Sequence, residues 1–327
     1  MKFILISSIV LLWSKLNEID LIRQIGEEYP EIRWPMTSTD RKICYDQFDA
    51  MGEKQNPDTG LSIDQLLTRH GYPVQRINVT TEDGYILGVY RIPFSPKSSI
   101  GVAKKAVLLQ HGQGANGLAW LVQSGPRNLA DRGFDVFILN ARGNTYSQGH
   151  VDPAMTPDNV KYWDFSFHEM GIYDLSAIIE MVTETTGNNA MFYVGHSMGT
   201  AMLAVLLSTR PEYNTRTLTG FLLSPAIQFG RTAPQLKFFT RGSNYFQENT
   251  KGTKSLKNIR EKGQNIFARK NEMLVDATKS ALKFPNLKEF NQIDDPLFTH
   301  LDFAIAKDAD ILLYNHILTI MTNATYE

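Results

Sequence analysis

From about residue 74 onward the chain alternates short apolar runs with longer amphipathic runs, and this alternation limits the fold more than any other feature. Short buried runs are typical of strands, and a run with helical apolar spacing, such as 173–185, is typical of a crossover helix. That run ends just before Gly187, as helices commonly do. This order predicts an α/β fold with a mostly parallel sheet flanked by helices. The predicted parallel strands are 106–110, 136–139, 191–194 and 220–223.

Further elements are expected at both ends of this sheet. Residues 74–79 and 85–92 flank the turn Glu82-Asp83-Gly84 and predict an opening pair of antiparallel strands. Residues 229–264 are polar, basic and poor in β-branched side chains, which predicts an insertion or loop. The remaining predicted elements are strands at 266–268 and 287–290 and a C-terminal helix from about Asp302.

The charge balance argues against nucleic-acid binding, and the cysteine content excludes disulfide and multi-thiolate zinc sites. Lys plus Arg number 33 and Asp plus Glu number 34, a net charge of −1 over 327 residues. The chain therefore lacks the basic excess that favours binding to nucleic-acid backbones. The single cysteine, Cys44, excludes an intramolecular disulfide and a multi-thiolate zinc site. We expect a fold held by packing, with no nucleic-acid partner and no metal.

The N-terminus predicts entry into the secretory pathway. Lys2 precedes the apolar run 3–13, which is too short for a membrane span of about 20 residues but typical of a signal-peptide core. We assign residues 1–18 to a signal peptide, with a buried N-terminal helix or strand as the alternative. Two glycosylation sequons, at Asn78 and Asn323, fit this route.

The strongest local motif is Gly195-His196-Ser197-Met198-Gly199, directly after the strand 191–194 and before an apolar helical run, 200–207. In this context Ser197 is expected on a sharp strand-to-helix turn with its hydroxyl projecting from the sheet. Gly195 and Gly199 are expected because side chains there would collide with the neighbouring strand and helix. The pattern predicts Ser197 as a nucleophile rather than a serine in an ordinary turn.

A serine nucleophile needs a base and two N–H donors for the developing oxyanion. The donors are predicted to be the N–H of Met198, which follows the nucleophile, and the N–H of Gln113, in the loop after the strand 106–110. Two histidines follow Ser197. His300 lies in a predicted loop after the last strand and is preferred as the base, whereas His316 lies within an apolar helical run and is interpreted as a helix residue.

The acid that orients the base is expected after the strand 266–268. Glu272 is the first carboxylate there, and Asp276 is the alternative. Asp294 and Asp295 lie too close to the histidine loop to be preferred.

Several motifs occur in a characteristic order along the chain. They are 78–88 (NVTTEDGYILG), 109–112 (LQHG), 140–145 (NARGNT), 165–170 (FSFHEM), 173–175 (YDL), 195–200 (GHSMGT) and 300–303 (HLDF). Together they resemble the acid lipase family, the gastric and lysosomal acid lipases, over almost the whole chain outside the insertion. The resemblance implies an α/β-hydrolase fold and hydrolysis of neutral lipid esters, such as triacylglycerols or sterol esters, at a lipid–water interface.

The resemblance also implies no cofactor and secretion or delivery to the lysosome. Carried over by motif, Ser197 is the nucleophile, His300 the base, and Gln113 and Met198 the oxyanion donors. The chain is then organised as a signal peptide (1–18), an N-terminal part of the hydrolase core (19–228), a reduced cap region (229–264) and a C-terminal part of the core (265–327).

Two departures from the family pattern affect the expected function. The family has an aspartate in a Gly-rich turn, where this chain has Ala268-Arg269-Lys270-Asn271-Glu272. The family also inserts a large cap after the strand that corresponds to 220–223, and most of that cap is expected to be absent here. The main hypothesis is therefore a serine ester hydrolase, and the alternative is a catalytically impaired, lipase-like lipid-binding protein.

Overall fold

The computed structural model describes residues 57–97, 104–122, 125–227, 264–269, 286–293, 303, 309 and 313–324. The predicted signal peptide, Cys44 and residues 229–263 of the predicted cap region lie outside the described residues. The chain divides into two compact units, Met1–Leu61 and Ser62–Glu327, and every helix and strand named below belongs to the second.

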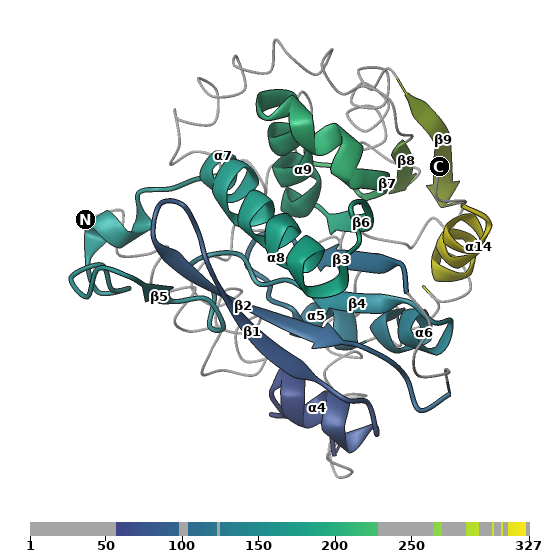
Figure 1. Ribbon diagram of the computed structural model, residues 1–327, viewed down its shortest axis with the longest axis horizontal. Helices are drawn as coiled ribbons and strands as arrows, with labels where there is room; N and C mark the ends of the chain where they lie inside the picture. The colour runs from purple at the N-terminus through teal and green to yellow at the C-terminus, as the bar shows by residue number, and fades with distance from the viewer. Residues whose placement is uncertain are drawn as a thin grey trace, which may run out of the picture. The chain divides into compact units, whose positions relative to one another are not determined.

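The sheet of this second unit has the strand order β1-β2-β4-β3-β6-β7-β8-β9, with the short β5 beside β2 (Figure 1). β2 is antiparallel to both β1 and β4. Every pair from β4 through β9 is parallel, so the predicted antiparallel opening and parallel centre are confirmed. The strands are β1 (Gln75–Thr80), β2 (Tyr85–Ile92), β3 (Ala106–Gln110), β4 (Asp135–Ile138), β5 (Gly149–His150), β6 (Met191–His196), β7 (Thr217–Leu223), β8 (Gln264–Arg269) and β9 (Leu287–Ile293).

The crossover helix predicted over 173–185 is present, but its regular α-helical part begins at Ser176 instead of Tyr173. Its first residues belong to a π-helical turn, η2 (Met170–Leu175), and the regular helix α8 (Ser176–Thr186) follows. α8 ends directly before Gly187, whose φ of 72° is a left-handed conformation that favours glycine. The predicted C-terminal boundary of this helix is therefore confirmed.

The helix predicted over 200–207 is α9 (Met198–Thr209), which begins directly after the β6 turn. Gly171 of η2 lies against it, since an added Cβ at Gly171 would be 2.8 Å from the Met202 carbonyl oxygen. Only glycine permits this approach of η2 to α9.

Shorter helices connect the remaining elements, and among the described residues no helix is both long and apolar enough to cross a membrane. β8 begins at Gln264, the last residue of the predicted insertion. The predicted start of the C-terminal helix near Asp302 lies outside the described residues.

The shorter helices that connect the remaining elements are α4 (Ile63–Arg69), α5 (Leu118–Leu121), α6 (Gly125–Asp131), η1 (Val160–Trp163), α7 (Phe167–Glu169), η3 (Pro211–Arg216) and α14 (Asn315–Asn323).

The central strands are buried on both faces, which explains their continuous apolar sequence. Leu108 and Tyr193 point to the face that packs with α8 and α9 in the main core cluster. Val107 and Phe192, one residue earlier in each strand, point to the opposite face and are also fully buried. The sheet is thereby a rigid platform for the loops that follow its strands.

Candidate active site

Ser197 lies at the turn between β6 and α9, where the sequence predicts a sharp strand-to-helix turn. Its φ of 51° and ψ of −114° form a conformation that residues other than glycine rarely adopt. Its N–H donates a hydrogen bond to the Leu223 carbonyl oxygen at the end of β7, at 3.0 Å. The side chain is half-buried. Strained backbone of this kind is concentrated at functional sites.

Gly195 and Gly199 flank this serine because the backbone passes too close for side chains. A Cβ added at Gly199 would lie 2.8 Å from the Gln110 carbonyl oxygen of β3. A Cβ added at Gly195 would lie 2.7 Å from the Tyr193 ring and 2.9 Å from the Gly199 carbonyl oxygen. The Tyr193 hydroxyl donates to that same carbonyl at 2.7 Å. The collision predicted from the sequence is therefore present at both glycines.

Thr200, to which no role is assigned from the sequence, secures the same turn. Its buried hydroxyl donates to the Ser197 carbonyl oxygen at 2.6 Å and accepts the Ala226 N–H at 2.9 Å. The serine turn is thereby joined to the segment after β7. The sequence shows only that a threonine follows Gly199. A hydroxyl side chain at that position does not by itself indicate which groups it will bond.

The loop after β3 lies directly beside Ser197. A Cβ added at Gly112 would be 3.0 Å from the Ser197 Cβ and 3.0 Å from the His196 Nδ1. Gly112 is buried, whereas Gln113, the next residue, is exposed. The two segments predicted to supply oxyanion donors are therefore adjacent in space.

The N–H groups of Gln113 and Met198 are available as donors. Neither forms a hydrogen bond within the described part of the chain. Met198 is the first residue of α9, where N–H groups have no partner in the helix and where the helix dipole favours negative charge. The arrangement can stabilise a developing oxyanion next to Ser197.

His111 begins this loop, and its ring is buried at 3% exposure. Burial lowers the pKa of His111 to about 4, against the opposing effect of a hydrogen bond to the Gly112 carbonyl. The ring is therefore neutral at physiological pH. Both of its nitrogens form hydrogen bonds, so His111 is not a candidate base for Ser197.

The loop after β4 is anchored by a buried ion-pair network centred on Arg142. The guanidinium contacts Asp174 of η2 at 2.6 Å and Asp83 of the β1–β2 turn at 2.5 Å. The side chains of Arg142 and Asp174 are fully buried, and the Asp83 side chain is 26% exposed. Burial acts to lower the pKa of Arg142, but the two carboxylates outweigh it, raise the pKa and keep the guanidinium charged.

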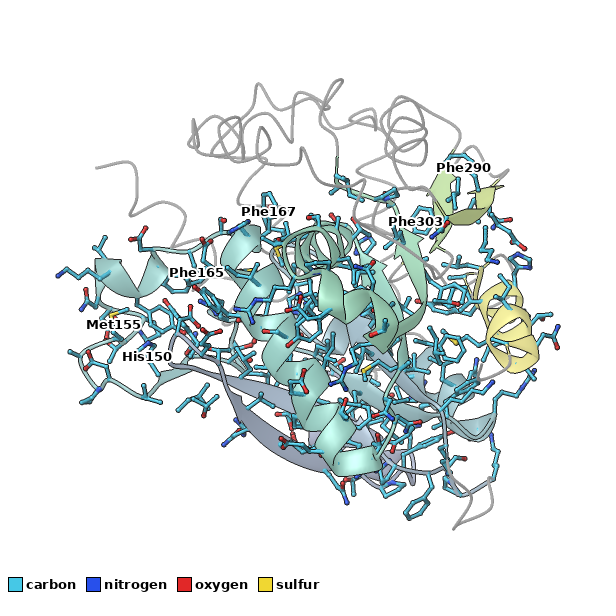
Figure 2. All side chains as sticks on the ribbon, turned by 45° about the horizontal axis from the view of Figure 1, so that its top comes forward. His150, Met155, Phe165, Phe167, Phe290 and Phe303 are labelled. Carbon is cyan, nitrogen blue, oxygen red and sulfur yellow. The ribbon has the colours of Figure 1, made fainter. Side chains whose placement is uncertain are left out.

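Aromatic rings surround this guanidinium. It lies 4.0 Å from the Tyr85 ring centroid and 5.6 Å from that of Phe165. Phe165 and His150 lie on neighbouring segments in Figure 2, and both rings pack against Tyr85 in edge-on geometry. The loop after β4 is thus held by charge and by packing.

Several predicted site residues lie outside the described residues: His300, Glu272, Asp276, Asp294 and Asp295. The other histidine considered as a base, His316, lies on α14, and its Nε2 is 2.9 Å from Glu289 Oε2 of β9. The position of His316 on α14 agrees with its interpretation as a helix residue. The structure thus brings together Ser197, Met198, Gly112 and Gln113.

Two family models match the chain. One describes the alpha/beta hydrolase fold and matches residues 105–240, and the other describes a partial alpha/beta-hydrolase lipase region and matches residues 63–124. Gastric triacylglycerol lipase of Rattus norvegicus is 42% identical over 188 residues, which are 56% of this chain and 47% of that protein. Lipase member K of Homo sapiens is 40% identical over 199 residues, 59% of this chain and 49% of that protein. The chain spans about half the length of these curated relatives.

Solved structures with the same fold are more distant in sequence. An esterase from Pyrococcus furiosus has a TM-score of 0.55 at 16% identity and covers 80% of this chain and 96% of its own. An alpha-beta hydrolase from Vibrio vulnificus has a TM-score of 0.54 at 17% identity, with coverage of 88% and 95%. These similarities concern the fold alone. Together the comparisons confirm the resemblance to the acid lipases over a little more than half of the chain, and they assign the chain to the α/β-hydrolase fold.

Proposed function

We propose that this chain hydrolyses carboxylic esters of neutral lipids with Ser197 as the nucleophile. The observation that supports this most is the strained conformation of Ser197 beside Gly112, together with the N–H groups of Gln113 and Met198, which have no hydrogen-bond partner among the residues that the structure describes. The lipases among the relatives, including a triacylglycerol lipase, supply the substrate class.

The proposed reaction proceeds through an acyl-enzyme. Ser197 Oγ attacks the ester carbonyl carbon while His300 accepts its proton, and the resulting oxyanion accepts hydrogen bonds from the Gln113 and Met198 N–H groups. His300 then returns the proton to the leaving alcohol, which leaves an acyl group on Ser197 Oγ. In the second half of the reaction His300 accepts a proton from water as the water attacks the acyl carbonyl carbon, and it returns that proton to Ser197 Oγ as the fatty acid leaves. Glu272 is proposed to orient His300. His300 enters this proposal through its motif alone, and Glu272 through its position after the strand 266–268 alone.

The proposed setting is the secretory pathway, with the protein secreted or lysosomal and acting at a lipid–water interface. The side chain of Asn78 is exposed on β1, which lies at one edge of the described sheet, and Asn323 is exposed at the end of α14. Both asparagine side chains are therefore accessible for glycosylation.

A series of p-nitrophenyl esters from acetate to palmitate, with and without emulsified triolein, tests the proposed activity. We expect wild-type protein to release p-nitrophenol and Ser197→Ala to fall to the rate without enzyme, because only the nucleophile is removed. If folded wild-type protein cleaves none of the esters, the proposal is wrong and the lipid-binding alternative is favoured.

A further inference from the structure

The buried ring of His111 connects the loop after β3 with the loop after β4. Its Nε2 lies 3.1 Å from the Ala141 backbone nitrogen and 3.1 Å from Asn144 Nδ2. The Asn144 amide orientation is set independently, because its Oδ1 accepts the Tyr146 N–H at 2.8 Å. Nε2 therefore faces two donors and accepts from both.

A neutral imidazole with an accepting Nε2 carries its proton on Nδ1. In His111, Nδ1 lies 2.7 Å from the Gly112 carbonyl oxygen, so the ring donates to that carbonyl. The Ala115 N–H approaches the same oxygen at the longer distance of 3.4 Å. The contacts from Asn144 and Ala141 thus determine the tautomer, and the tautomer determines the hydrogen bond to Gly112.

This hydrogen bond fixes more than one carbonyl group. The Gly112 C=O and the Gln113 N–H belong to one planar trans peptide, in which they point in opposite directions. A carbonyl held toward the His111 ring turns the Gln113 N–H away from that ring. Gly112 packs against Ser197, and the Gln113 N–H has no hydrogen-bond partner among the described residues.

We propose that His111 is a positioning residue for ester hydrolysis: its Nδ1–H holds the Gly112–Gln113 peptide so that the Gln113 N–H faces the oxyanion formed at Ser197. This inference rests on the proposed function. Asn144 acts one step further away, because its amide keeps the proton on the correct ring nitrogen.

Two amide substitutions of His111 separate its donor from its acceptor. In His111→Asn the amide nitrogen replaces Nδ1 and keeps a donor for the Gly112 carbonyl. In His111→Gln the amide oxygen replaces Nε2 and keeps the acceptor for Ala141 and Asn144, but the donor is lost. Both variants lose the ring. His111→Asn also loses the acceptor of two hydrogen bonds and His111→Gln loses one donated hydrogen bond, so a purely structural role predicts that His111→Asn is impaired at least as much as His111→Gln.

We expect kcat for p-nitrophenyl butyrate to fall roughly 100-fold in His111→Gln, comparable to loss of one oxyanion donor, and less than about tenfold in His111→Asn. KM should change less than about threefold in both, because the oxyanion forms only after substrate binds. Urea unfolding of each variant shows what fraction is folded under assay conditions, and kcat is expressed per folded molecule.

A second pair of variants leaves His111 unchanged and remains informative if a His111 variant does not fold. Asn144→Asp keeps the acceptor for Tyr146 but replaces one of the two donors to Nε2 with a carboxylate oxygen, which in the neutral ring favours the proton on Nε2 over Nδ1. Asn116→Asp is the matched control, because Asn116 Oδ1 also accepts a backbone N–H, that of Leu118 at 2.9 Å, without contacting His111. We expect kcat to fall at least about tenfold in Asn144→Asp and to stay near wild type in Asn116→Asp.

The outcomes distinguish this inference from the proposed function. Equal kcat per folded molecule in His111→Asn and His111→Gln, or in Asn144→Asp and Asn116→Asp, overturns the inference while an active wild type retains the proposed function. A folded wild type that cleaves no ester overturns both.

Discussion

At the scale of single residues, glycines of the candidate site lie so close to neighbouring atoms that a Cβ atom has no room. Gly112 illustrates this, since an added Cβ would press on both Ser197 and His196 at 3.0 Å. We expect Gly112→Ala to displace either the loop after β3 or Ser197 and to lower kcat/KM roughly 100-fold, because the proposed oxyanion donors act only when correctly placed. Ester hydrolysis at several substrate concentrations measures this effect.

A remote glycine with equal crowding provides the control for Gly112→Ala. A Cβ added at Gly149 of β5 would also lie 3.0 Å from a neighbouring Cβ, that of Ile86. Gly149→Ala should therefore perturb packing to a similar degree and leave kcat/KM within about twofold of wild type. Equal losses of activity in the two variants would show that crowding, and not the position beside Ser197, causes the effect.

At the scale of elements, Arg142 joins the loop after β4 to η2 and to the β1–β2 turn. We expect Arg142→Met to lower the free energy of unfolding by about 3–5 kcal/mol, because it leaves the fully buried carboxylate of Asp174 without its cationic partner. Activity should fall as well, since the adjacent Ala141 N–H contacts His111. Urea unfolding followed by circular dichroism measures the stability.

An exposed ion pair shows how far this effect depends on burial. Arg216 lies 3.5 Å from Glu180, and their side chains are 30% and 46% exposed. Arg216→Met should cost only about 0–1 kcal/mol, because such pairs are well solvated. A loss in Arg142→Met no larger than that in Arg216→Met would contradict the anchoring role of the buried network.

Helices and strands whose apolar residues follow one regular spacing are predictable from this sequence. An element that changes its helix type along its length, or that has only two residues, is not. The central strands are continuous apolar runs, and α8 ends at a glycine, so both are visible in the sequence. The π-helical turn Met170–Leu175 has no distinct periodicity, because it continues the apolar spacing of the helix. β5 has only Gly149 and His150 and forms through its pairing with β2, which no local pattern encodes.

The site is predictable only where its residues share a motif. Ser197, Met198 and the two glycines lie together in the chain, so their geometry follows from one strand-to-helix turn. The contacts of His111 with Ala141 and Asn144 join residues about thirty positions apart and exist only after β3 and β4 pair. His300 and Glu272 stay predictions.

At the scale of the whole molecule, the buried neutral His111 links stability to pH. Its pKa is about 4 in the folded protein against an ordinary value of 6.5. As pH falls below 6.5 the unfolded chain binds a proton that the folded protein excludes, so the free energy of unfolding decreases by up to about 3 kcal/mol between pH 6.5 and 4. Below pH 4 this contribution levels off.

Comparison with His111→Gln isolates this contribution from those of other groups. Urea unfolding at pH 7, 6, 5 and 4 should show the stability advantage of wild type over the variant shrinking as pH falls, because the variant has no ring to protonate. A difference in unfolding free energy that stays constant from pH 7 to 4 would show that His111 is not held neutral by burial.

The attachment of a serine-directed probe tests the assignment of Ser197 most directly. Folded wild-type protein and Ser197→Ala are incubated with a fluorophosphonate, digested and analysed by mass spectrometry, with circular dichroism confirming that both are folded. We predict that wild type carries one phosphonate on the peptide containing Ser197 and that Ser197→Ala carries none. Equal labelling of the two proteins, a label on another residue, or no label on folded wild type would contradict the assignment.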